Sequence, residues 1–207
     1  MQLLNGVKVI DFSKWLPGQY CGMLLGDYGA DVIKIEDLQG DSTRHFFPAK
    51  EPGMSYWHLM MNRNKRDVTL NLKTEGGREL LTKLLQDADV FLEGFRPGYL
   101  ARFGLDYETI HKINPRLIYC SITGFGQKSH KPAHDLNVIG LAGLNSLDDT
   151  GNACVSEIQV SALGSSLNAL SAICMSLFAR ERTGQGQYID VNLYATALSL
   201  QATAVSS

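Results

Sequence analysis

Short β-branched or apolar segments alternate with longer segments of helical spacing at the start of the chain. Residues 7–12 read as a strand, residues 17–29 have apolar positions at helical spacing, and residues 31–35 read as a second strand. A strand, a helix and a strand within about 30 residues form the pattern of a right-handed βαβ crossover. This pattern predicts a parallel sheet.

The same alternation recurs further along the chain. It predicts strands at 67–72, 89–92 and 116–123, with one helix beginning at Thr74 and another around Ile110. Repeated βαβ units pack their helices on both faces of one sheet. We therefore expect an α/β fold with a Rossmann-like, doubly wound and mainly parallel sheet.

The remaining sequence is less regular. A polar loop is predicted at 145–152, a long buried helix at 163–180, a strand at 188–193 and an apolar helix from Tyr194 onward. An apolar helix needs a surface to pack on, so we expect further residues or another chain to supply it. No repeat or Pro-rich linker divides the sequence, which favours a single α/β domain over 1–207.

Composition narrows the class of protein. The 207 residues are 44% hydrophobic and 19% charged, which fits a globular chain able to bury a core. With 19 basic and 21 acidic residues the net charge is -2, so nothing attracts nucleic acid or anionic membranes in general. Neither a targeting signal nor about 20 consecutive apolar residues is evident. We expect a cytoplasmic protein without nucleic-acid or membrane partners.

Motifs for common cofactors are missing from the sequence. Neither GxGxxG after a strand nor GxxxxGKS occurs, so a nicotinamide cofactor or ATP has no support, and GxSxG is missing too. The cysteines lack the close spacing of a zinc site or redox motif: Cys21, Cys120, Cys154 and Cys174. We predict reduced core thiols and no metal site.

Several short sequence motifs, called phrases below, occur along the chain in an order that is typical of one protein family. They cover residues 10–12, 23–36, 62–66, 93–98, 114–127, 133–135 and 182–187. In this order they resemble the family III CoA-transferases, which include formyl-CoA transferase, carnitine CoA-transferase and α-methylacyl-CoA racemase. The resemblance covers nearly the whole chain and implies the first half of a CoA-binding large domain, without the second half and small domain. It further implies acyl-CoA and a carboxylic acid as partners, and either a homodimer or a complementing second-half chain.

The resemblance also implies a set of coenzyme A contacts. Such a site needs cations for phosphate, a turn with free N–H groups and an apolar channel for the pantetheine arm. The residues carried over are Leu16, Pro17, Leu70, Asn71, Leu72, Lys73, Gly94, Phe95, Arg96 and Arg102. Gly94 stands where many members have Asn, and Asp37 where some have a cation. The alternative interpretation of Arg96 and Arg102 is a solvated surface charge.

His134 and Asp135 form the candidate catalytic pair. In racemase-like members a His at this point exchanges a proton with the α-carbon of an acyl-CoA, a task that suits the imidazole pKa. In the alternative interpretation His134 starts a helix and Asp135 serves as a cap or orienter.

The aspartate nucleophile of the transferases has no evident counterpart. A carboxylate that attacks a thioester forms a mixed anhydride, which can accept CoA and pass it on. Counting back from residues 182–184 puts the family position close to Ser161, and the nearest acids are Glu157, Asp149 and Asp148. Ser161 itself has no evident base.

Three functions therefore stay open. The first is a CoA-transferase with an unusual nucleophile or with a separate chain that completes it. The second is a racemase or epimerase that uses His134, and the third is a non-catalytic CoA-binding or assembly subunit.

Overall fold

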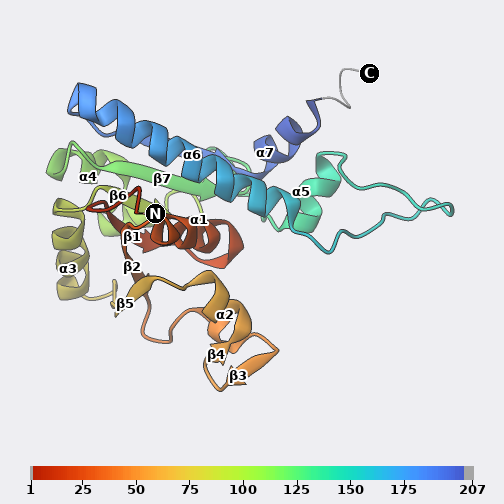
Figure 1. Cartoon of the computed structure of the whole chain (residues 1–207), viewed down its shortest axis with the longest axis horizontal. Helices are drawn as coiled ribbons and strands as arrows, with labels where there is room; N and C mark the ends of the chain where they lie inside the picture. The colour runs from red at the N-terminus through yellow and green to blue at the C-terminus, as the bar shows by residue number, and fades with distance from the viewer. Residues whose placement is uncertain (1, 203–207) are drawn as a thin grey trace.

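The computed structural model describes residues 2–202, and a six-stranded parallel sheet lies at its centre (Figure 1). The strand order is β5-β2-β1-β6-β7-β8. The strands are β1 (Lys8–Phe12), β2 (Asp31–Glu36), β5 (Lys65–Thr69), β6 (Val90–Glu93), β7 (Ile118–Thr123) and β8 (Tyr188–Asn192). The order runs outward in both directions from the β1/β6 pair, which makes that pair the topological switch point. The α/β prediction is confirmed.

Helices cover both faces of the sheet. They are α1 (Trp15–Asp27), α3 (Glu75–Gln86), α4 (Tyr107–Ile113), α5 (Asp135–Leu141), α6 (Val160–Thr183) and α7 (Leu193–Leu200). Two hydrophobic cores reflect this layering, because successive side chains of a strand point to opposite faces. Val9 of β1 packs with α1 and α6, whereas Ile10 packs with α3 and α4. The sheet is therefore doubly wound.

A small lobe is inserted between β2 and β5. It holds the 3-10 turn η1 (Ser42–His45), the hairpin of β3 (Ala49–Glu51) and β4 (Met54–Ser55), and helix α2 (Tyr56–Met61). Figure 1 shows the lobe below the sheet and beside α1. The lobe brings charged side chains of the β2–β5 connection toward the carboxyl end of β1.

One strand begins and ends earlier than predicted. The predicted strand at 67–72 is Lys65–Thr69, which pairs with β2 in parallel register. Lys65 belongs to the strand because its backbone pairs with Val32 of β2. Its ammonium group is buried against Asp11, and alternation of polar and apolar residues does not reveal such a pair. In consequence Leu70 and Lys73 lie in the loop after β5, at the carboxyl edge of the sheet.

Helix α6 extends the predicted helix at both ends and contains 24 residues. By length and apolar composition alone it meets the requirements of a membrane span, as the core helix of a soluble protein also does. Here it packs along α1 and β7. Its last turns bury Arg180, which pairs with Asp89 at 2.8 Å. At its other end, Ser166 donates a hydrogen bond to the carbonyl of Pro17 at 2.7 Å.

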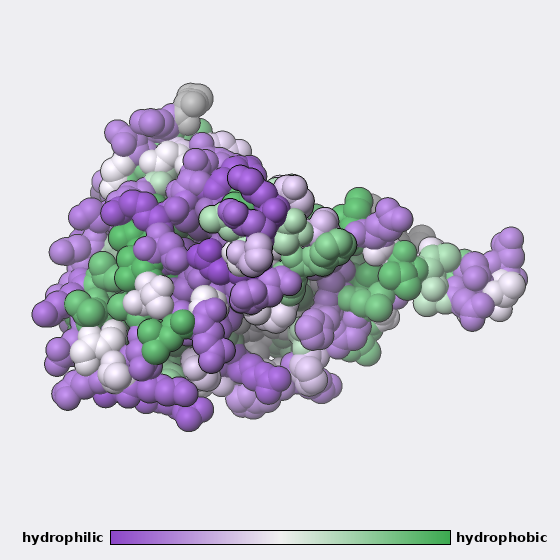
Figure 2. Space-filling model, turned by 90° about the horizontal axis from the view of Figure 1, so that it is seen from below, coloured by the Kyte–Doolittle hydropathy of each residue, from purple (hydrophilic) through white to green (hydrophobic). Residues whose placement is uncertain are grey.

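A long arm joins α5 to α6 and projects from the body of the molecule (Figure 1). Residues 145–159 contain only an isolated bridge between Leu147 and Ala153. Cys154 is exposed on this arm, so the prediction of a core thiol is wrong there, whereas Cys21 and Cys120 are buried as predicted. Figure 2 shows hydrophobic surface where the arm leaves the body and a hydrophilic tip. Exposed apolar side chains on α5 and the arm are Leu136, Leu141, Leu147, Val155 and Ile158.

Helix α7 follows β8 directly and packs on α6 and α5. It buries Leu193, Thr196 and Ala197, and leaves Leu198 and Leu200 exposed. The predicted apolar helix therefore finds part of its packing surface within the chain.

Candidate functional site

Two adjoining clefts open at the carboxyl edge of the sheet, around the switch point. Open α/β sheets bind ligands at this place, because loops diverge there and leave a crevice. The larger one, the main cleft, has a volume of about 560 Å³, and the smaller one, the side cleft, about 380 Å³. Lys14 and Phe95 line both, so the two clefts adjoin at these residues.

Loops after β1, β6 and β7 form the main cleft together with the starts of α5, α6 and α7. Its predicted members are Leu16, Pro17, Gly94, Phe95, Arg96, His134 and Asp135. Sequence reasoning missed its other members: Lys14, Trp15, Phe46, Trp57, Pro97, Ile122, Thr123, Gly124, Ser129, His130, Lys131, Pro132, Ala133, Gln159, Ala162 and Leu193. The lining thus combines apolar surface with several cations.

The side cleft lies at the carboxyl ends of β1, β2 and β5, and most of the other predicted contacts line it. Its lining includes Leu70, Asn71, Leu72 and Lys73 with Phe12, Asp37, Leu38, Gln39, Tyr99 and Phe103. Phe95 stacks on Tyr99 with ring centroids 4.8 Å apart, which gives the cleft an aromatic wall. Asp37 accepts a hydrogen bond from Lys14 at 3.0 Å, so its charge is paired.

Arg102 alone of the predicted contacts lines neither cleft. It lies in the 3-10 turn η2 (Leu100–Phe103), where its guanidinium carbon is 5.9 Å from the ring centroid of Tyr99. Because Tyr99 itself lines the side cleft, Arg102 lies behind that wall rather than in it.

The turn after β1 is held in an unusual conformation. Trp15 has a φ of 66°, a left-handed value that is rare for a bulky residue. Asp11 accepts hydrogen bonds from the Ser13 backbone at 2.9 Å and from the Ser13 hydroxyl at 2.5 Å. Lys34 donates to the Ser13 carbonyl at 3.2 Å. Side chains of β1 and β2 thereby fix the turn that presents Trp15 and Leu16 to the main cleft.

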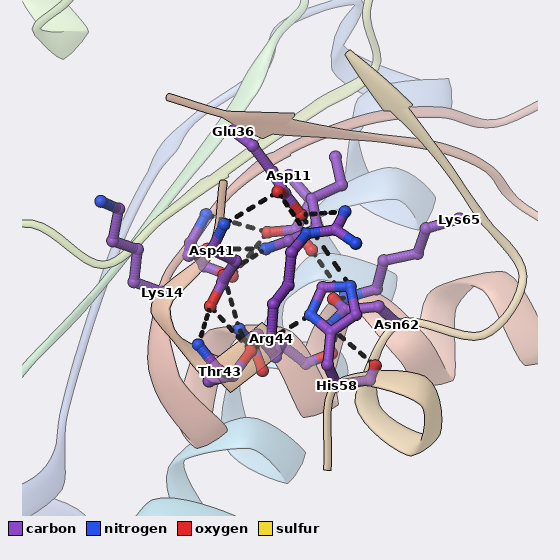
Figure 3. A network of polar contacts seen from close by, with 12 residues as sticks. Asp11, Lys14, Glu36, Asp41, Thr43, Arg44, His58, Asn62 and Lys65 are labelled. Carbon is purple, nitrogen blue, oxygen red and sulfur yellow. Dashed lines mark hydrogen bonds and ion pairs between the residues drawn. The ribbon is translucent and has the colours of Figure 1, made fainter. Parts of the chain in front are cut away.

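Asp11 and Lys34 belong to an ion-pair network that also contains Asp41 and Lys65. Figure 3 shows Asp11, Asp41 and Lys65 among the neighbouring polar side chains. Lys65 lies 2.8 Å from Asp11, and Lys34 lies 2.9 Å from Asp41. No side chain of the four is more than 2% exposed. Charges removed from water at this depth are stable only when they are paired and hydrogen-bonded.

The network shifts the pKa values of its members. Burial opposes ionisation of Asp11, but the charges of Lys65 and Lys34 outweigh it and lower the pKa of that carboxyl. Burial likewise opposes ionisation of Asp41, yet Lys34 and the hydrogen bonds from Thr43 lower its pKa to about 2. Burial lowers the pKa of Lys65, with Asp11 acting against it. Both carboxyl groups therefore stay charged at neutral pH.

Asp135 joins the beginnings of two helices. It is the first residue of α5, and its Oδ1 accepts hydrogen bonds from the Ser161 hydroxyl at 2.6 Å and from the Ala162 backbone at 2.8 Å. Ser161 and Ala162 lie in the first turn of α6, so Asp135 caps α6 rather than α5. His134 precedes α5, and its backbone N–H donates to Asn137 at 2.6 Å.

Ser161 is turned away from the main cleft. Its side chain is completely buried, and its hydroxyl is committed to Asp135. Ala162, the next residue of α6, lines the cleft instead. The first turn of α6 therefore brings no carboxylate to the cleft, whereas Asp135 does so from the start of α5.

Glu93 ends β6 beneath the junction of the two clefts. It is 5% exposed, and its Oε2 accepts a hydrogen bond from the Phe95 backbone at 2.8 Å. Burial raises the pKa of Glu93 to about 7, although hydrogen bonds from Ser121 and Phe95 act against it. Sequence reasoning used this residue only as part of a longer phrase, since nothing local shows that the carboxyl is buried without a cation.

Metal ligands do not gather at the clefts. Within residues 2–202, no group of three or more His, Cys, Asp or Glu side chains is arranged to hold a metal ion.

Comparison with known proteins gives one consistent result. A family model described as CoA-transferase family III matches residues 4–207. The succinyl-CoA:glutarate CoA-transferase of Mus musculus is 38% identical over 96% of this chain and 47% of its own length. The formyl-CoA:oxalate CoA-transferase of Streptomyces avermitilis is 36% identical over 95% of this chain and 49% of its own length. The chain thus spans about half the length of the curated relatives it matches.

Solved structures agree with the sequence comparison. The crystal structure of a CAIB/BAIF family protein from Brucella suis superposes with a TM-score of 0.93 at 36% identity. The match covers 98% of this chain and 56% of that one.

Proposed function

The chain belongs to CoA-transferase family III, and from this premise we propose that it binds a CoA thioester along the two clefts and moves CoA between an acyl-CoA and a carboxylic acid. The acyl donor and the acceptor acid are its proposed partners. As further partners we propose a second copy of the chain, in a homodimer, or a complementing chain that carries the second half.

The adjacency of the two clefts, whose linings share Lys14 and Phe95, is the observation that carries this proposal. The side cleft offers an aromatic wall with Lys73 at one end, which suits the nucleotide end of CoA. The main cleft combines apolar surface with Arg96 and Lys131, which suits an acyl thioester and an acid. A pantetheine arm that passes Lys14 and Phe95 would join the two.

The positions of the ten residues carried over from the family support the same assignment. Leu16, Pro17, Gly94, Phe95 and Arg96 line the main cleft, whereas Leu70, Asn71, Leu72 and Lys73 line the side cleft. Only Arg102 lies outside both linings. Residues from three separate segments therefore converge on two adjoining clefts.

A racemase is the second candidate function, and the position of His134 favours it. His134 lines the main cleft beside Asp135, where an imidazole would face the α-carbon of a bound acyl group. The two candidates differ in one measurement. A racemase exchanges the α-proton of an acyl-CoA with deuterium, whereas a transferase moves CoA to a second acid.

Calorimetric titration of the chain with CoA and with succinyl-CoA tests the shared premise. Saturable binding of both ligands is expected, with the side cleft holding the nucleotide end. Lys112→Ala serves as the control, because Lys112 is exposed on α4 and lines neither cleft. Folded chain that binds neither ligand would contradict the proposal.

A further inference from the structure

Asp135 is the one carboxylate among the described residues that line the main cleft. The same lining includes the cations Lys14, Arg96 and Lys131, of which Lys14 is paired with Asp37. Among residues 2–202, no second carboxylate lines this cleft.

The two carboxylate oxygens of Asp135 differ in their contacts. Oδ1 accepts the two hydrogen bonds from the first turn of α6, at 2.6 and 2.8 Å. No hydrogen bond or ion pair from the described residues reaches Oδ2. Two hydrogen bonds on one oxygen fix the orientation of the other.

Competing nucleophiles are placed elsewhere. Glu157 and Asp149 lie on the exposed arm and line neither cleft. Glu93 is buried and lines neither cleft. The Ser161 hydroxyl donates a hydrogen bond to Asp135 and is buried as well. Ala162 has no side-chain functional group to offer.

We propose that Asp135 is the nucleophile of this chain, attacking an acyl-CoA through Oδ2 while Ser161 and the Ala162 backbone hold Oδ1. This inference rests on the proposed transferase function. It assigns the carboxylate that the transfer chemistry needs to the start of α5, because the start of α6 carries none.

The reaction balances with the groups named. Oδ2 adds to the thioester carbonyl carbon, a C–O bond forms, the C–S bond breaks and CoA leaves as a thiolate. The product is a mixed anhydride of Asp135 and the acyl group. The thiolate then attacks the Asp135 carbonyl carbon, which releases the acyl group as a carboxylate and leaves Asp135 as a CoA thioester. Attack by the acceptor carboxylate reverses these steps, with no redox change.

Trapping of the Asp135 thioester tests the inference. The chain is incubated with succinyl-CoA and then treated with borohydride, which reduces an aspartyl thioester to homoserine, and the peptides are analysed by mass spectrometry. Homoserine is expected at position 135 in the wild-type chain and in Glu157→Gln, but not in Asp135→Asn. Ser161→Ala should slow the labelling about 10-fold without changing the affinity for CoA, because one of the two bonds to Oδ1 is lost.

Calorimetry on the same samples separates the two ways in which the experiment fails. Folded chain that binds no CoA overturns the transferase proposal itself. Chain that binds succinyl-CoA but carries homoserine at another residue, or at none, overturns the role of Asp135 and leaves CoA binding intact. Asp135→Asn that still yields the label would overturn it as well.

Discussion

The ion-pair network and the main cleft lie side by side at the same edge of the sheet, yet they treat charge in opposite ways. In the network, Lys65 meets Asp11 and Lys34 meets Asp41 with almost no exposed surface. In the main cleft, Arg96 and Lys131 are exposed, and neither side chain has an ion pair with any residue in 2–202.

The difference follows from solvent. A buried charge must find an opposite charge within the fold, whereas an exposed cation is stabilised by water until an anion replaces that water. The network therefore fixes the shape of the turn that carries Trp15, and the cleft keeps its cations available. The paired charges of the network stabilise the fold, whereas the unpaired cations of the main cleft are available to bind an anionic ligand.

The largest expected effect tests the structural half of this comparison. Lys65→Met leaves Asp11 buried without its partner, so the free energy of unfolding should fall by about 3–5 kcal/mol. The double change Asp11→Asn with Lys65→Met should recover part of that loss, since the two residues are coupled. Urea denaturation measures both variants.

A neighbouring residue provides the control for this experiment. Arg66→Met removes the exposed pair with Asp31 and should cost less than about 1 kcal/mol. If Lys65→Met were as stable as Arg66→Met, the buried pair would contribute no more to stability than the exposed pair, which contradicts the prediction.

The sequence predicted one side of this comparison much better than the other. The βαβ units were predictable because β1, β6 and β7 are buried on both faces and read as apolar runs. The pair of Lys65 with Asp11 was not, because 54 positions separate its members. The contact of Asp135 with Ser161 also joins distant segments, and no local pattern records it.

The cleft was predictable to the extent that its residues lie in phrases of the family. Gly94 and Phe95 were recognised in this way, whereas Trp57 and Lys131 belong to segments outside any such phrase. Convergence of separate loops on one edge depends on strand order, which a sequence pattern does not specify.

Glu93 combines one property of each region. Its carboxyl group is buried, as in the network, and it has no ion-pair partner among residues 2–202, as the exposed cations of the main cleft have none. Its pKa of about 7 in the folded chain lies above the ordinary 4.5, so between about pH 5 and 7 the folded state binds more protons than the unfolded state. The free energy of unfolding should therefore fall as pH rises through this window, by up to about 3 kcal/mol.

Glu93→Gln isolates this contribution. The amide keeps the shape of the side chain and cannot ionise. The free energy of unfolding of Glu93→Gln should therefore fall less between pH 5 and 8 than that of the wild-type chain. Urea denaturation at both pH values measures it, with Glu157→Gln on the exposed arm as the control. Equal pH dependence in wild type and Glu93→Gln would show that Glu93 is ionised at no cost.

Arg96 tests the binding half of the comparison. Arg96→Ala should weaken CoA-thioester binding about 10-fold, the value of one charge-assisted hydrogen bond, without lowering the free energy of unfolding. Calorimetry and urea denaturation together measure both properties. Loss of stability with unchanged affinity would place Arg96 with the network rather than with the cleft.

Arg102 carries the smallest expected effect and marks the outer limit of the binding surface. Its guanidinium lies over Tyr99, outside the lining of both clefts, so Arg102→Ala should change the affinity for CoA less than about 2-fold. Tyr99→Ala removes the wall itself and should weaken binding more than Arg102→Ala does. A 10-fold loss in Arg102→Ala, reduced by added salt, would mean that this cation meets phosphate directly and that the cationic surface extends past Tyr99.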